Sequence, residues 1–288
     1  MNEFPKAVSV VMRSFNEAWA IGDTIRQLFA QDFDGKIELI VIDSGSSDGS
    51  IEIIKSANPA KLIQIPLGSY VPGVVLNQGA REASHDWIVY LNADATPVGR
   101  NWLTELLKPC IGNPKFGAAF SRQVPRPDCM AVFAHDYDRC FGPNRESANW
   151  EHFFSMVSSV THRSVLAQVP IREDLQFAED DEWTRRLAAQ GFEIPFAIDS
   201  VAMHSHNYTL RQSYKRAFGD AKAMAATSTI APSPVLLGWL ADSFRDAKWC
   251  LANHRLTGFP FASAVRFSQR LGRRDGDRSG RKFYHPRS

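Results

Sequence analysis

Apolar and polar positions in the first hundred residues predict strands separated by helices. Four β-rich runs are expected to form strands, at residues 7–12, 37–42, 61–65 and 87–91. The apolar positions between them recur with a helical period, which predicts helices at 18–31, from 51 onward and at 74–83. Strands that alternate with helices of this length indicate βαβ units and a largely parallel sheet.

The pattern changes beyond residue 100. We expect a helix at 102–110, a strand at 116–122, a helix at 180–190 that ends at Gly191, and helices at 210–226 and 235–251. Residues 130–150 have no clean periodicity, and no element is predicted there. The expected organisation is an α/β domain over residues 1–209, a helical extension over 210–270 and a basic, flexible tail over 271–288.

Composition narrows the class of protein. The chain has 288 residues, of which 44% are hydrophobic, so it can build a large core. A net charge of +2 argues against a nucleic-acid-binding protein. The cysteines lack metal-ligand spacing and indicate a reducing compartment. The first residues do not resemble a signal peptide, and no apolar run approaches the roughly 18 residues of a membrane span, so we expect a cytoplasmic protein.

The C-terminal region is locally basic. Residues 266–287 contain seven Arg and one Lys against Asp275 and Asp277. A packing helix with a solvated tail is the favoured interpretation. The alternative is peripheral attachment of this basic C-terminus to the anionic inner face of the cell membrane.

Three polar clusters follow predicted strands. Arg13 to Glu17 follow the first strand, Asp43 and Ser44 the second, and Asp94 the fourth. The carboxyl ends of parallel strands share one edge of a sheet, so these groups are expected to share a crevice. Asp94 could hold a divalent cation that binds a diphosphate. Asp43 and Asp48 also suit a turn, and the residue two before Asp94 is Asn92 rather than a second aspartate.

Two later clusters add candidate chemistry. Residues 179–182 are four consecutive acids, which favour a helix N-terminus and offer a general base. His204 and His206 would share one face of an extended segment, where they could bind a metal or phosphate or be structural. The motifs of dinucleotide oxidoreductases, P-loop NTPases and α/β-hydrolases are absent from the sequence. Transfer from a metal-bound nucleotide donor is the remaining α/β chemistry.

The sequence resembles family 2 glycosyltransferases in the blocks at residues 8–17, 41–49, 76–81, 91–95, 122–127 and 178–180. Asn92, the block 122–127 and residues 205–212 look most like bacterial rhamnosyltransferases that use dTDP-L-rhamnose. The resemblance implies a glycosyltransferase A fold, a mixed and mostly parallel sheet flanked by helices, with a C-terminal helical extension. It also implies inverting transfer, here of L-rhamnose onto a cell-surface or exported glycan precursor.

The resemblance also assigns roles to residues. Binding of the nucleotide-sugar donor would involve Arg13, Phe15, Glu17, Asp43, Ser44, Arg81, Asn92 and Asp94. The metal, Mg²⁺ or Mn²⁺, would be held by Asp94 with His204 or His206. Asp180 would be the general base, with Glu179 orienting or binding the acceptor. A glycan or lipid-linked glycan acceptor would meet Trp183, stacking on a sugar ring, and Arg122.

Two alternatives remain open at this point. The same fold could use a UDP-hexose or UDP-N-acetylhexosamine donor. The protein could also be a non-catalytic carbohydrate-binding protein, which Asn92 favours. The pair Glu179 and Asp180 argues against that second alternative, because a binding protein needs no base.

Overall fold

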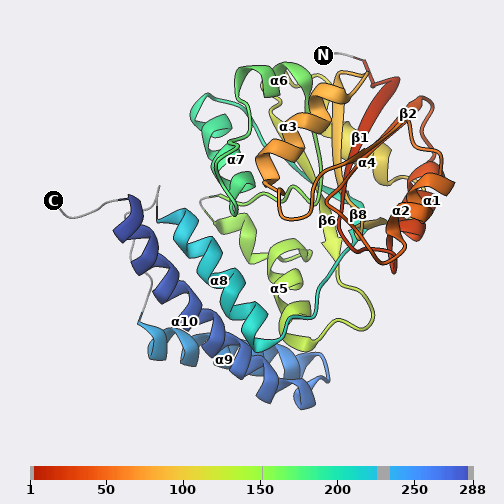
Figure 1. Cartoon of the computed structure of the whole chain (residues 1–288). Helices are drawn as coiled ribbons and strands as arrows, with labels where there is room; N and C mark the ends of the chain where they lie inside the picture. Colours follow the sequence, from red (N-terminus) through yellow and green to blue (C-terminus); the bar gives the residue numbers. More distant parts are fainter. Residues whose placement is uncertain (1–2, 151, 226–233, 285–288) are drawn as a thin grey trace. The chain divides into compact units, whose positions relative to one another are not determined.

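The structure is a computed structural model that describes residues 3–150, 152–225 and 234–284 (Figure 1). The chain forms two compact units. The first consists of Met1–Val124, Glu146–Leu175 and Glu179–His204, and the second of Pro125–Arg145, Gln176–Ala178 and Ser205–Ser288. Among the described helices, none combines the length and apolar character that crossing a bilayer requires.

The first unit is built on an eight-stranded sheet in the order β3-β2-β1-β4-β7-β6-β8-β5. Its strands are β1 (Ala7–Ser14), β2 (Lys36–Asp43), β3 (Lys61–Gln64), β4 (Trp87–Asn92), β5 (Thr96–Pro97), β6 (Ala118–Val124), β7 (Ser158–His162) and β8 (Phe196–Met203). Strands β1 to β4 pair in parallel, as does β6 with β8. Strand β7 is antiparallel to β4 and β6, and β5 is antiparallel to β8. The predicted mixed, mostly parallel sheet is confirmed, although β5, β7 and β8 were not predicted.

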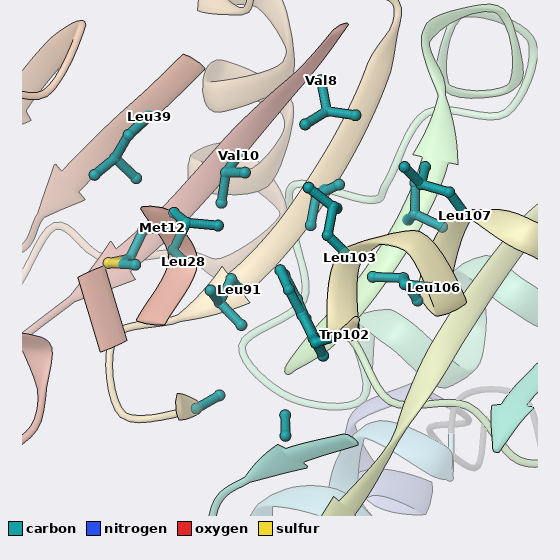
Figure 2. Packing of buried hydrophobic residues seen from close by; sticks show 14 of the residues in the cluster. Val8, Val10, Met12, Leu28, Leu39, Leu91, Trp102, Leu103, Leu106 and Leu107 are labelled. Atoms are coloured by element: carbon teal, nitrogen blue, oxygen red, sulfur yellow. The ribbon is translucent and has the colours of Figure 1, made fainter. Parts of the chain in front are cut away.

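One face of this sheet is covered by α1 (Ile21–Phe29), α2 (Ser50–Ser56) and α4 (Trp102–Leu107). Val8, Val10 and Met12 of β1 point toward these helices and pack with Trp102 and Leu28 (Figure 2). Alternate residues of a strand face opposite sides of a sheet, so this row of β1 belongs to one hydrophobic layer. This hydrophobic layer holds β1 in place. It therefore also fixes the position of the polar cluster at residues 13–17, at the carboxyl end of β1.

Helix α3 (Pro72–Glu82) packs on β1 from the other face. A Cβ on Gly79 would lie 2.2 Å from a methyl carbon of Val11, so only glycine allows this close approach. The remaining helical segments of the unit are η1 (Lys108–Cys110), η2 (Glu146–Asn149), α6 (Arg163–Gln168) and α7 (Glu179–Ala189). Gly191 follows α7 with a φ of 83°, which confirms the predicted helix end.

The second unit is helical. It contains α5 (Ala131–Phe141), α8 (Leu210–Met224), α9 (Val235–Ala252), η3 (Leu256–Gly258) and α10 (Phe259–Tyr284). A capping box formed by Thr209 and Gln212 starts α8. The two predicted helices at 210–226 and 235–251 are confirmed as far as the structure describes them, since residue 226 lies outside the described residues, whereas α5 lies in the stretch where no element was predicted.

The flexible tail was expected over residues 271–288; this is wrong for residues 271–284, which continue α10, and residues 285–288 lie outside the described part of the chain. Gly272, Gly276 and Gly280 read as helix breakers in the sequence, but their spacing of four places them on one face of α10. Cβ atoms there would lie 2.2–2.5 Å from backbone oxygens of α8. The glycines therefore allow α10 to pack closely along α8, and that contact stabilises the helix.

Candidate active site

Two loops at the carboxyl ends of β1 and β2 hold each other in place. The Asn16 N–H donates to Ser46 Oγ at 2.8 Å, and Asn16 Oδ1 accepts from the Ser47 N–H at 2.9 Å. Asp48 Oδ2 accepts from the Ala18 N–H at 2.9 Å. Asn16 adopts a φ of 54°, a left-handed conformation that asparagine tolerates. These reciprocal bonds make the two loops one wall.

That wall borders a cavity of about 430 Å³, within the size range of small-ligand sites. It is lined by Arg13, Ser14, Phe15, Glu17, Ser44, Leu67, Gly68, Tyr70, Asn92 and Asp94. The polar groups that follow β1, β2 and β4 therefore share one cavity. Ser14 belongs to the predicted cluster at residues 13–17, whereas Leu67, Gly68 and Tyr70 were not predicted; the turn chemistry around Gly68, placed directly after the third strand, was the available signal.

Arg13 is held on three sides. Its Nη2 donates to Asn92 Oδ1 at 2.8 Å, and its Nη1 donates to Tyr70 Oη at 3.0 Å. Nη1 also lies 3.6 Å from Glu179 Oε1. The amide oxygen of Asn92 thus accepts from the guanidinium without neutralising it, and Arg13 connects the cavity to the start of α7.

Asp180 is a partly buried acid at the start of α7. Its Oδ1 accepts from the Asp181 N–H at 2.9 Å. Burial, followed by the neighbouring charge of Glu179, raises the pKa of the Asp180 carboxyl to about 7, against the opposing effect of Arg13. A carboxyl group with a pKa near neutrality is suited to proton transfer.

Asp94 and His204 form a pair suited to a metal ion. Both are buried, and His204 Nε2 lies 3.4 Å from Asp94 Oδ2. Gln123 donates from its amide nitrogen to Ser155 Oγ at 2.8 Å, which turns its Oε1 toward His204 Nδ1 at 3.0 Å. Nδ1 of the neutral ring then carries the proton, and the Nε2 lone pair faces the carboxylate. An imidazole and a carboxylate oriented in this way fit a divalent cation. His206 belongs to the second unit, and its predicted role stays a prediction.

Two predicted donor-binding residues do not line the cavity. The buried carboxylate of Asp43 accepts from the N–H groups of Gly45 and Ser46 at 3.0 and 2.8 Å, so the turn interpretation is confirmed for it. Arg81 lies on α3, where it forms an exposed ion pair with Glu173 at 3.5 Å. Their contacts with the nucleotide stay predictions.

The two residues predicted to bind the acceptor, Trp183 and Arg122, lie in different environments. Trp183 is fully buried, and its indole N–H donates to the Val169 carbonyl at 2.7 Å. No face of the ring is open to a sugar, so the predicted stacking role is wrong; the periodicity of α7 places Trp183 on its core side. Arg122 lies within β6, just after four buried residues. Its buried Nε has no hydrogen-bond partner among the described residues.

The family of the chain follows from its sequence profile. The profile of Glycosyl transferase family 2 matches residues 9–169, more than half of the chain. The protein is a family 2 glycosyltransferase. This match covers β1, β2, β4 and the cavity between their carboxyl ends.

Proteins similar to this chain include two Salmonella rhamnosyltransferases. The chain is 25% identical over 192 residues to the O-antigen chain rhamnosyltransferase RfbN of Salmonella typhimurium, and the match covers 63% of this chain and 61% of RfbN. It is 26% identical over 221 residues to the O-antigen chain rhamnosyltransferase WbaN of Salmonella anatum, covering 73% and 70%. The match therefore spans less than two thirds of RfbN.

Solved structures confirm the glycosyltransferase A fold. The mannosyltransferase PcManGT of Pyrobaculum calidifontis, in complex with GDP-Man and Mn²⁺, superposes with a TM-score of 0.60 at 22% identity, covering 90% of this chain and 74% of PcManGT. TarS residues 1–349 of S. aureus superpose with a TM-score of 0.54 at 14% identity, covering 98% and 93%.

Proposed function

We propose that this family 2 glycosyltransferase transfers L-rhamnose, with inversion, from dTDP-L-rhamnose to a cell-surface or exported glycan precursor. The names of RfbN and WbaN support the sugar and the class of acceptor. The observation that carries the proposal of catalysis is Asp180, whose pKa burial raises to about 7. Its neighbour Glu179 is paired with Arg13 of the cavity wall. A protein that only binds carbohydrate has no need of such a base.

In the proposed reaction, the Asp180 carboxylate takes the proton of an acceptor hydroxyl group. The acceptor oxygen attacks the anomeric carbon from the face opposite the nucleotide, the bond from that carbon to the diphosphate oxygen breaks, and dTDP leaves. Such general-base assistance is worth roughly 10²–10⁴-fold in rate. Arg13 supplies a fixed positive charge in the cavity. Mg²⁺ or Mn²⁺ held by Asp94 and His204 would neutralise charge on the leaving diphosphate.

Arg122 is proposed to bind an anionic part of the acceptor. A buried guanidinium nitrogen without a hydrogen-bond partner among the described residues costs free energy unless a ligand supplies an acceptor atom. A phosphate of a lipid-linked glycan would satisfy it through a charge-assisted hydrogen bond.

The test of the function uses Asp180→Asn. We expect transfer from dTDP-L-rhamnose to fall by about 10²–10⁴-fold, while donor binding measured by calorimetry persists. Asp181→Asn is the matched control, because Asp181 is in the same helical turn but its carboxylate pairs with Arg185 at 2.8 Å. Near-parental turnover of Asp180→Asn would refute the assignment of the base. Product formation by the parent protein would exclude the alternative that the protein binds carbohydrate without catalysing transfer.

A further inference from the structure

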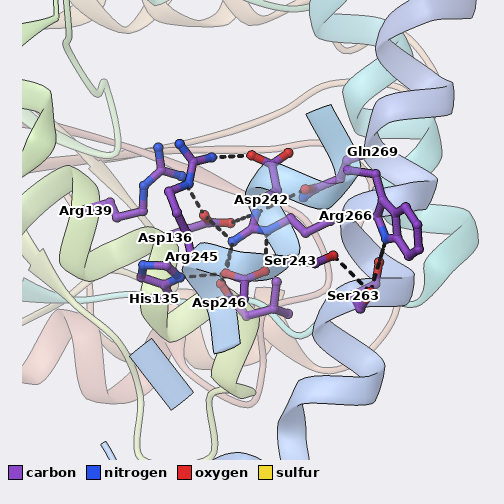
Figure 3. Close-up of polar contacts among 12 residues, drawn as sticks. His135, Asp136, Arg139, Asp242, Ser243, Arg245, Asp246, Ser263, Arg266 and Gln269 are labelled. Carbon is purple, nitrogen blue, oxygen red and sulfur yellow. Dashed lines mark hydrogen bonds and ion pairs between the residues drawn. The ribbon is translucent and has the colours of Figure 1, made fainter. Parts of the chain in front are cut away.

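Helix α9 has its polar residues inside. Its buried residues are Gly238, Asp242, Ser243, Asp246 and Cys250. Asp246 receives two bonds from Arg266, at 2.8 and 2.9 Å, and one from His135 Nδ1 at 2.6 Å (Figure 3). Asp242 accepts from Arg270 Nε at 2.6 Å. The acids of α9 are thus neutralised within the second unit, and the helix is held there by ion pairs.

The opposite side of α9 is apolar and exposed. We call it the α9 apolar face; its residues are 51–66% exposed and comprise Leu236, Leu237, Leu240, Phe244 and Leu251. A helix on the surface of a soluble protein normally has the reverse arrangement, with apolar residues toward the core and charges toward water. Contiguous exposed apolar residues of this kind mark an interaction surface.

The charges around this face have one sign. Of the two exposed charged side chains of α9, Arg245 forms an ion pair with the buried Asp242, so Lys248 carries the exposed positive charge. The Lys248 Nζ lies 4.5 Å from the centre of the Phe244 ring, so cation and apolar face are adjacent. Apolar residues bordered by cations complement an anionic lipid surface.

We propose that the α9 apolar face lies in the interfacial region of an anionic membrane. A symmetric contact with a second copy would use the same face twice and bring the positively charged Lys248 side chains of the two copies near each other. Anionic headgroups instead attract Lys248, while the Leu and Phe side chains enter the acyl boundary. We therefore place the membrane contact on α9 rather than on the basic tail suggested by the sequence, because Arg274 and Arg281 of that tail are paired with Asp275 and Asp277. This proposal is independent of the transferase reaction.

Vesicle sedimentation of the full chain tests the proposal. We expect binding to phosphatidylcholine vesicles that contain phosphatidylserine, and at least a tenfold weaker apparent affinity for the variant Leu237→Ser/Leu240→Ser/Phe244→Ser. Phe29→Ser, which changes a similarly exposed residue of α1 in the first unit, should bind like the parent. Lys248→Glu should weaken binding to the anionic vesicles only. Thermal unfolding of each variant checks its fold.

Three outcomes would overturn the membrane proposal. The parent could fail to sediment with anionic vesicles, or the triple variant could bind as the parent does. The parent could also be a dimer by analytical ultracentrifugation that the triple variant converts to a monomer, without vesicle binding by either. The last result would assign the face to a second copy. Lys248→Glu keeps the test decisive if the triple variant does not fold.

Discussion

At the scale of single residues, the environment of Asp180 sets a pH dependence. Its carboxyl group has a pKa raised to about 7, by burial first and then by the charge of Glu179. A general base works in its deprotonated form, so activity should rise with pH through about 7 and level off above it. Below that value the rate should fall about tenfold for each pH unit, as the fraction of carboxylate does.

Glu179→Gln should move this profile. Removing the negative neighbour lowers the pKa of Asp180, because one of the two effects that raise it is lost while burial and the opposing charge of Arg13 remain. The acid limb of kcat/KM plotted against pH should therefore shift to lower pH. Glu182→Gln, whose side chain pairs with Arg186 at 2.8 Å, serves as the control and should leave the profile in place. An unshifted profile in Glu179→Gln would show that another group produces the acid limb.

Arg13 illustrates how a residue's geometry matters beyond its charge. Arg13→Lys keeps the positive charge but cannot contact Asn92 and Tyr70 through a planar fork. Hydrogen bonds to charged groups contribute about 1.5–3 kcal/mol, so kcat/KM should fall by about 10- to 100-fold, which steady-state kinetics would measure. Arg81→Lys, in an exposed ion pair, should cost little. Equal activity of both variants would contradict a positioning role for Arg13.

At the scale of elements, two glycines in equivalent positions should behave differently. Gly73 and Gly22 are each the second residue of their helix, α3 and α1. A Cβ on Gly73 would lie 1.8 Å from the Arg172 carbonyl oxygen, whereas on Gly22 its nearest neighbour is a methyl carbon of Ile53 at 3.4 Å. Gly73→Ala should therefore destabilise the fold by about 1–3 kcal/mol. Gly22→Ala should be neutral or stabilise it by up to about 1 kcal/mol.

Denaturant unfolding of the two glycine variants gives the comparison. The stretch near Arg172 is also bound by Asn77, whose amide nitrogen donates to the Ile171 carbonyl at 2.8 Å. Helix α3 thus anchors the backbone segment at residues 171–173. If Gly73→Ala were as stable as Gly22→Ala, α3 would not pack on this segment as closely as described.

At the scale of the whole molecule, donor and metal should raise the melting temperature together. A ligand at 100 times its dissociation constant stabilises a protein by about 2.7 kcal/mol. We expect a thermal shift with dTDP-L-rhamnose and Mn²⁺, and smaller shifts with UDP-hexoses or UDP-N-acetylhexosamines. Asp94→Asn should lose the Mn²⁺-dependent part, because the carboxylate facing His204 is removed. A larger shift with a UDP-sugar would reassign the donor.

The sequence predicted the first half of the molecule better than the second. Strands β1 to β4 are apolar runs with turn residues between them, so local pattern and tertiary role agree. Strands β7 and β8 instead contain buried serines, such as Ser158, Ser159 and Ser200, which weaken the apolar signal. Helix α9 was predicted as a helix, but its orientation could not be predicted, because its buried face is ionic and its exposed face apolar.

Only part of the candidate site was predicted, and the reasons are similar. Residues at strand ends, such as Arg13, Asn92 and Asp94, could be found because the order of parallel strands brings them together. Tyr70 was missed, because only the turn chemistry around Gly68 marks its loop and its contact with Arg13 depends on tertiary packing. The burial of Trp183 likewise depends on which face of α7 meets the core.

The reciprocal bonds between the loops after β1 and β2 also bear on how the cavity can be engineered. Asn16 bonds to Ser46 and Ser47, and Asp48 bonds back to Ala18. A chimera that imports one loop from a relative would lose partners in the other and collapse the shared wall. Residues 15–19 and 44–50 should therefore be grafted as one cassette, as the smallest exchangeable module of the cavity.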